Sequence, residues 1–198
     1  MAYPTVSAPY GFEPINRVDG MPYAGAIRQI PVTQAAAMYN GDLVELDVGG
    51  VVGTASSLTA GAKLGVFVGC QYTNSSGQTV QAQYYPGSSV TNAVAFVVDD
   101  PMAAFKVAVT NASNVIATVT SAAVGTNVTA LAGTPSSVTG NSGASILSTS
   151  PAATDTFPLR VIAVVPETAT GANAFTEVIV KINFGIHQYN NATGLAVA

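Results

Sequence analysis

The sequence predicts a mainly β fold, an antiparallel β-sandwich or barrel with an extended N-terminal arm and little helix. Apolar residues alternate with period two in several segments, which is typical of strands with one buried face. Turn signals rich in Gly, Asn, Asp and Pro recur about every 8–12 residues, the spacing of sandwiches and barrels. The short connections favour antiparallel pairing. A chain of 198 residues is long enough for one domain with its own core.

Residues 1–31 are predicted to form the extended arm. Proline has no N–H for a strand ladder and blocks helix interiors, and this segment contains five prolines. We expect the arm to lie along a surface, either its own or a neighbour's; a frayed tail is the alternative. Its aromatic and apolar side chains are the candidate partner-binding residues, namely Tyr3, Tyr10, Phe12, Ile15, Met21 and Tyr23.

Residues 32–110 are predicted to form most of the β body. The alternation over 43–48 followed by Gly49-Gly50 predicts a hairpin with a two-residue turn, because both glycines tolerate positive φ. Residues 93–98 are apolar on both faces, which predicts a central strand. In the strand over 64–72, every second residue is predicted to share one face: Leu64, Val66, Val68, Cys70 and Tyr72.

Residues 158–190 are predicted to complete the β body, with strands over 159–165 and 175–184. The second strand places one apolar face toward the core, carrying Val178, Val180, Ile182 and Phe184. Residues 191–198 form a C-terminal tail.

The stretch 111–157 is predicted to be a low-charge loop or small insertion packed on the body, because a chain without charge is ill suited to a freely solvated coil. Short strands are expected within it over 115–120 and 126–131, and an irregular loop over 133–156.

The chain contains few charged residues. Ten acidic and six basic residues make 8% of the sequence, where roughly 25% is usual, and none lies between Lys106 and Asp155. The hydrophobic fraction is 48% and the mean hydropathy +0.40, yet no apolar run reaches the roughly 18 residues of a membrane span. Such a surface predicts that a partner covers much of it. With net charge −4 and scattered cations, we expect no binding to nucleic acid or membrane.

No catalytic motif is present, so we predict that the protein is not an enzyme and holds no cofactor or metal. The chain lacks a phosphate-binding glycine loop, a hydrolase nucleophile elbow and a zinc-helix motif. A single histidine, His187, and a single cysteine argue against a zinc site. His187 is predicted to be a surface or interface residue and Cys70 a small buried hydrophobe. The pair Asp99-Asp100 before Pro101 ends a strand more simply than it builds a calcium site.

Several strings resemble, in this order, a family of small head proteins of marine and freshwater tailed phages. They include Tyr10-Gly11-Phe12-Glu13-Pro14, Asn40-Gly41-Asp42-Leu43-Val44, Gly65-Val66-Phe67-Val68-Gly69-Cys70-Gln71-Tyr72, Val97-Val98-Asp99-Asp100-Pro101 and Leu159-Arg160-Val161-Ile162. These family members are thought to be capsid decoration, or cement, proteins. The resemblance covers about residues 10 to 190 and is weakest over 111–157.

The resemblance implies a structural protein of the virion, made in the host cytoplasm, that binds the outer surface of the major capsid shell and bridges capsomers. Its partners would be the major capsid protein and further copies of itself, as a homotrimer or alternatively a dimer. The family offers no catalytic residue to carry over. Two other readings stay open: a tail, fibre or receptor-binding module of the virion, and a β-sandwich hydrolase or glycan binder.

Overall fold

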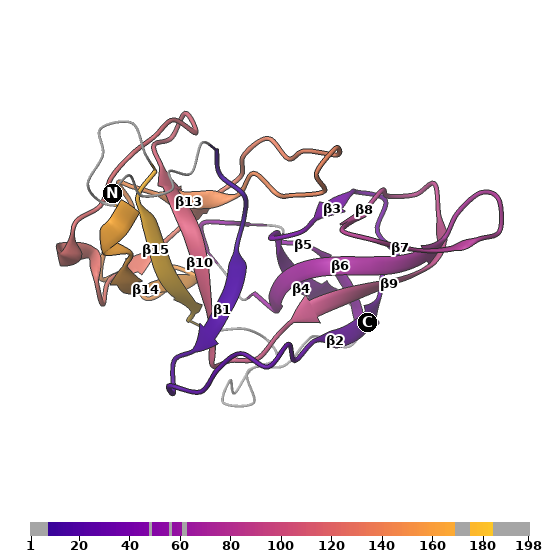
Figure 1. Ribbon diagram of the computed structural model, residues 1–198, viewed down its shortest axis with the longest axis horizontal. Coiled ribbons are helices and arrows are strands. Elements are labelled where there is room, and N and C mark those ends of the chain that lie inside the picture. Colours follow the sequence, from indigo (N-terminus) through magenta and orange to yellow (C-terminus); the bar gives the residue numbers. More distant parts are fainter. Residues whose placement is uncertain (1–7, 48, 56, 61–62, 169–174, 184–198) are drawn as a thin grey trace.

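The predicted fold class is confirmed: the chain is mainly β, and its strands form two large sheets and one two-stranded ribbon (Figure 1). The computed structural model describes residues 8–47, 49–55, 57–60, 63–168 and 175–183. Within these ranges, helix is limited to the 3-10 turns η1 (Ser121–Ala123) and η2 (Pro166–Thr168). The ribbon pairs β3 (Met38–Tyr39) with β8 (Tyr84–Tyr85).

The six-stranded sheet nearly closes into a small barrel. Its path runs β2 (Arg28–Pro31), β9 (Thr91–Val98), β6 (Gly65–Thr73), β4 (Leu43–Asp47) and β5 (Val51–Thr54), with β7 (Thr79–Ala82) paired to β6. A parallel bridge between Val32 and Val52 brings the two ends of the path together. One core cluster belongs to this sheet and includes Ile30, Met38, Val44, Phe67, Cys70 and Val97.

Two sequence-based predictions for this sheet are confirmed. Strand β9 is central, because it pairs with β2 on one side and β6 on the other. Strands β4 and β5 form the expected hairpin, and Gly49 and Gly50 at its turn have φ values of 89° and 75°. Such values suit glycine because it lacks a Cβ.

Strand β6 departs from the predicted alternation. The ladder to β9 shifts register between Phe67 and Gly69, which marks a β-bulge, and Gly69 has φ 146°. A bulge adds one residue and so reverses which face the following residues occupy. As a result Val66 packs in one core cluster, whereas Phe67 and Cys70 share the other. The prediction that Cys70 lies on the face of Val66 is therefore wrong.

The seven-stranded sheet is built around β10 (Ala103–Thr110). Its path runs β11 (Asn127–Val128), β14 (Leu159–Val164), β15 (Glu177–Ile182), β10, β13 (Ser145–Leu147) and β12 (Ala130–Leu131). Strand β1 (Glu13–Arg17) also pairs with β10, on the edge away from β15. All of these pairs are antiparallel except β10 with β13.

The stretch 111–157 is part of this sheet. It contributes β11, β12 and β13, so the irregular loop predicted over 133–156 needs correction: β13 lies within it and buries Ile146. Residues 115–120 form no strand and make only an isolated bridge from Ile116 to Thr110. The strand expected over 126–131 is present as the two short strands β11 and β12. Strand β13 is three residues long, which is too short for an alternation pattern to reveal it.

The described part of the predicted arm, residues 8–31, belongs to both sheets. Strand β1 lies on β10 and β2 lies on β9, so this segment crosses from one sheet to the other (Figure 1).

A second core cluster lies where the two sheets face each other. Leu43, Val66 and Val98 of the six-stranded sheet pack there against residues of the other sheet, which include Phe105, Val107, Val109, Leu159, Val161, Val178 and Val180. The predicted buried face of β15 is thus confirmed for Val178, Val180 and Ile182, while Phe184 lies outside the described residues.

Three chain segments meet tightly at one end of this shared core. Phe12 N donates to Gly41 O at 3.0 Å, and Gly41 N donates to Phe67 O at 2.8 Å. A Cβ at Gly11 would lie 2.8 Å from the Cα of Gly41 and from the Cβ of Ser142, closer than real Cβ contacts come. We call residues 10–12, 40–42 and 140–144 the junction.

Replacing Gly11 by Ala is expected to destabilise the protein strongly, because the new methyl group has no room and φ is 88°. Gly20 provides a matched control, since its φ is 84° but a Cβ there would meet nothing within 4 Å. We expect Gly20→Ala to lower the free energy of unfolding by about 1–2 kcal/mol and Gly11→Ala by about 1–3 kcal/mol more. Denaturant unfolding measures both, and equal losses would show that the junction is looser than described.

Candidate interaction surface

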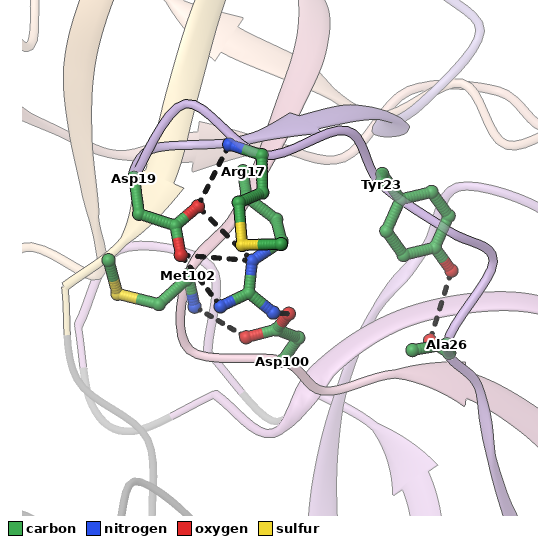
Figure 2. A network of polar contacts seen from close by, with 7 residues as sticks. Arg17, Asp19, Tyr23, Ala26, Asp100 and Met102 are labelled. Atoms are coloured by element: carbon green, nitrogen blue, oxygen red, sulfur yellow. Dashed lines mark hydrogen bonds and ion pairs between the residues drawn. The ribbon is translucent and has the colours of Figure 1, made fainter.

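The six candidate partner-binding residues of the N-terminal segment have different environments. Phe12 is only 1% exposed and belongs to the core of its own chain, so it has no surface to offer in this conformation. Ile15 is half-buried in β1, and Met21 is 60% exposed. Tyr23 packs against the same core as Phe12 and donates its hydroxyl to Ala26 O at 3.0 Å (Figure 2). Tyr3 lies outside the described residues.

Tyr10 is tied to the sheet by a buried acidic partner. Its hydroxyl donates to Glu177 Oε1 at 2.5 Å, and Lys106 Nζ lies 5.7 Å from its ring centroid. Burial, followed by the hydrogen bond to Glu177, raises the pKa of the Tyr10 hydroxyl, so it stays protonated. Lys106 also pairs with Glu13 at 3.2 Å and Glu177 at 3.8 Å.

A second charged network fixes the turn after β1 (Figure 2). Arg17 donates from Nη1 to Asp100 Oδ2 at 2.6 Å and from Nη2 to Asp19 Oδ2 at 2.8 Å. The Asp19 carboxylate also accepts from Met21 N, and Asp100 accepts from Met102 N. The hydrogen bond from Arg17 lowers the pKa of Asp19. A third pair joins Arg28 Nη2 to Asp99 Oδ2 at 2.6 Å.

These charged side chains hold the N-terminal segment against the two sheets. Each of the ion pairs described above involves a residue between Glu13 and Arg28 or lies beside Tyr10. The Asp99-Asp100 pair therefore binds Arg28 and Arg17 and holds the N-terminal segment on both sheets. Sequence reasoning had assigned these aspartates only to a strand end, because partners about 80 residues away leave no local signal.

The stretch without charge supplies a different kind of surface. Val115, Val124 and Val138 are among its exposed side chains, and Val138 is 95% exposed. Val138 lies at the tip of an ordered turn in which Gly140 N donates to Ser136 O at 2.7 Å and Ser136 N donates to Asn141 O at 3.0 Å. The turn thus presents an apolar side chain that its own fold leaves uncovered.

Three further ionisable side chains are buried or half-buried. Cys70 is fully buried, as predicted, and burial raises the pKa of its thiol to about 11, which leaves it protonated and unreactive near neutral pH. Lys63 is 1% exposed and donates to Ala60 O at 3.0 Å. Asp42 accepts from Ser142 Oγ at 2.5 Å and from Tyr39 N at 2.8 Å, and its burial raises its pKa.

Metal-ligand clusters and membrane-spanning helices are both absent from the described residues. No group of three or more His, Cys, Asp or Glu side chains is placed to hold a metal ion in that part of the chain. None of the helices described there is long and apolar enough to cross a membrane. His187 lies outside the described ranges.

No protein-family model, no curated protein and no solved structure matches this chain.

Truncation to Ala is expected to destabilise the protein strongly at Phe12 and hardly at all at Met21. Phe12→Ala should lower the free energy of unfolding by about 3–5 kcal/mol, because it leaves a cavity in the core. Met21→Ala should change it by less than about 0.5 kcal/mol, because that side chain is mostly in solvent. Chemical denaturation of the two variants checks this. A mild effect of Phe12→Ala would mean that residues 10–12 are not part of the fold in solution.

Asp42 is expected to contribute a pH dependence to stability. Since its pKa is raised in the folded state, the folded protein favours the protonated carboxyl, and that contribution is lost as pH rises above the ordinary value of 3.8. The stability of the wild type relative to Asp42→Asn should therefore fall over this range, by about 1.4 kcal/mol for each unit of pKa elevation. Denaturant unfolding of both proteins between pH 3.5 and pH 7 measures the difference, and a rise with pH would contradict the raised pKa.

Proposed function

We propose that this protein is a capsid decoration protein of a tailed phage, which binds the outer surface of the major capsid shell and bridges neighbouring capsomers. The observation that carries the proposal is the absence of charged residues from 107–154, a stretch in which Val138 is 95% exposed on an ordered turn. The resemblance of the strings at residues 10–14, 40–44 and 97–101 to phage head proteins supports the same reading.

The physical argument concerns the cost of removing water from a surface. A charged group that loses water at an interface needs a partner, whereas Ser, Thr, Ala and Val surfaces lose water without leaving an unpaired charge. An ordered turn adds little further loss of conformational freedom on binding. A surface of this composition is therefore suited to permanent contact with another protein.

The exposed surface of the body, more than the N-terminal segment, makes the contacts in this proposal. Strands β1 and β2, together with the ion pairs of Arg17 and Arg28, fix residues 13–31 on their own chain, so this segment is not free to extend as an arm onto a neighbour. Bridging then depends on several weak patches on one rigid body and on self-association as a trimer or dimer. Multiple linked contacts raise the overall affinity through effective concentration.

The abundance of the chain in purified particles separates this proposal from its alternatives. A decoration protein should be present at the same order of abundance as the major capsid protein, measured by quantitative mass spectrometry of the virion. A tail, fibre or receptor-binding module would be present in a few copies. Absence from the particle would refute both readings and leave a hydrolase or glycan binder to be tested on the isolated protein.

Val138→Asp is expected to weaken binding to undecorated capsids by roughly tenfold or more, because it places a charge in an interface that excludes water. The fold should be unaffected, since the side chain contacts almost nothing in its own chain. Ile27→Asp is the matched control, an apolar residue at 47% exposure outside the charge-free stretch. Co-sedimentation with capsids measures affinity and thermal unfolding measures stability. Equal affinities of the two variants would remove Val138 from the contact surface.

A further inference from the structure

Two cations lie opposite each other on β14 and β15, which are neighbours in the seven-stranded sheet. Arg160 on β14 and Lys181 on β15 are direct partners in the antiparallel ladder. Both line the same cavity of about 510 Å³, which Asn127, Asp155, Ile162 and Asn183 also line. Like charges directly opposite on paired strands repel each other and lower stability. The site therefore has an unfavourable feature that the fold itself does not require.

No acidic side chain of the described residues forms an ion pair with these two cations. Arg17, Arg28 and Lys106 each have a carboxylate partner, and Lys63 is buried against a backbone carbonyl. All ten acidic residues of the sequence lie within the described ranges, and none of them forms an ion pair with Arg160 or Lys181. Asp155 also lines the cavity, so its lining carries two positive charges and one negative charge, a net charge of +1.

Hydrogen bonds hold the guanidinium of Arg160 in place. Its Nε donates to Asn127 Oδ1 at 2.9 Å, and Asn183 Nδ2 donates to the same oxygen at 2.9 Å. Asn127 is itself buried and donates from Nδ2 to Thr154 O at 2.9 Å. The two terminal nitrogens of Arg160 make no hydrogen bond with any described residue, and together they match the two oxygens of a carboxylate.

We propose that this cavity is a carboxylate-binding site that receives an acidic side chain of a protein partner. Lys181 supplies a second positive charge beside the fork of Arg160, and Ile162 offers an apolar wall for the methylene groups of Asp or Glu. A protein carboxylate fits better than nucleic acid, because two cations in a chain of net charge −4 make no track for a phosphate backbone. In the context of the proposed function, on which this step rests, the acidic group belongs to the capsid shell.

The test uses the full chain and tetraglutamate as the probe, with tetraglutamine as the uncharged control, at low salt. Backbone amide shifts in nuclear magnetic resonance should concentrate at residues 127, 160, 181 and 183 with tetraglutamate only. Lys181→Gln and Arg160→Gln should each raise the dissociation constant by roughly three- to tenfold. Since Arg160→Gln also loses the bond to Asn127, Lys181→Gln is the cleaner variant, and thermal unfolding confirms that both are folded.

A substitution at Asp155 is expected to strengthen binding, whereas the two cation variants weaken it. Asp155→Asn should lower the dissociation constant for tetraglutamate, because it removes the only negative charge that lines the cavity. Asp47→Asn changes the net charge equally on an exposed strand end elsewhere and should have no effect. Equal effects of the two variants would show that only the net charge matters and would overturn the site.

Further outcomes separate the possible ligands. Inorganic phosphate that binds as tightly as tetraglutamate would overturn the assignment to a protein carboxylate, and tighter binding of a single-stranded oligothymidine would point to nucleic acid instead. Capsid binding is measured separately. If the wild type and Lys181→Gln bind undecorated capsids equally, the cavity is not the shell contact although the proposed function stands. If the wild type does not bind capsids, the proposed function fails and the peptide titration still decides the site.

Discussion

The close approach of Gly11 to Gly41 is the constraint on which the arrangement of the two sheets depends. Only two residues without side chains let these backbones come near enough for Phe12 N to donate to Gly41 O. That bond sets Phe12 into the core shared by both sheets. Asp42 binds the third segment through Ser142 Oγ, and Gly11 N reaches Ala144 O at 3.2 Å. The strings Tyr10 to Pro14 and Asn40 to Val44 therefore have a common structural purpose, although they lie about 30 residues apart.

The sequence was informative wherever a strand is long enough to display its period. Strands β9, β14 and β15 and the Gly49-Gly50 hairpin agree with the predictions because each buries a regular face over several residues. The bulge at Gly69 escaped notice, since a glycine within an apolar run looks the same whether or not it reverses the alternation. Strand β13 also escaped notice, because its pairing partners, and not its own residues, decide that it is a strand.

The candidate surface was only partly accessible to sequence reasoning. Low charge density over 107–154 is a property of composition and could be read directly. The role of Phe12 could not, because an aromatic residue in a proline-rich segment looks alike whether it enters its own core or a neighbour's. The pairing of Arg160 with Lys181 depends on the register of two strands, and a shift by one residue would place one of them on the buried face.

The distribution of charge gives the molecule two kinds of surface. Ion pairs hold the described part of the N-terminal segment on the body, because Arg17 binds Asp100, Arg28 binds Asp99 and Lys106 binds Glu13. Two other features of the described residues are available for contact with other molecules. They are the exposed valines of the stretch without charge and the cations Arg160 and Lys181, which form no ion pair. Uncharged residues add buried area to an interface but do little to fix how the two proteins are oriented. A fixed charge contributes little area, but it favours the one orientation that brings it to its partner. In the proposed role, a protein bound in one orientation on a repeating capsid lattice needs both area and orientation, so the two features would serve one binding event better than either alone.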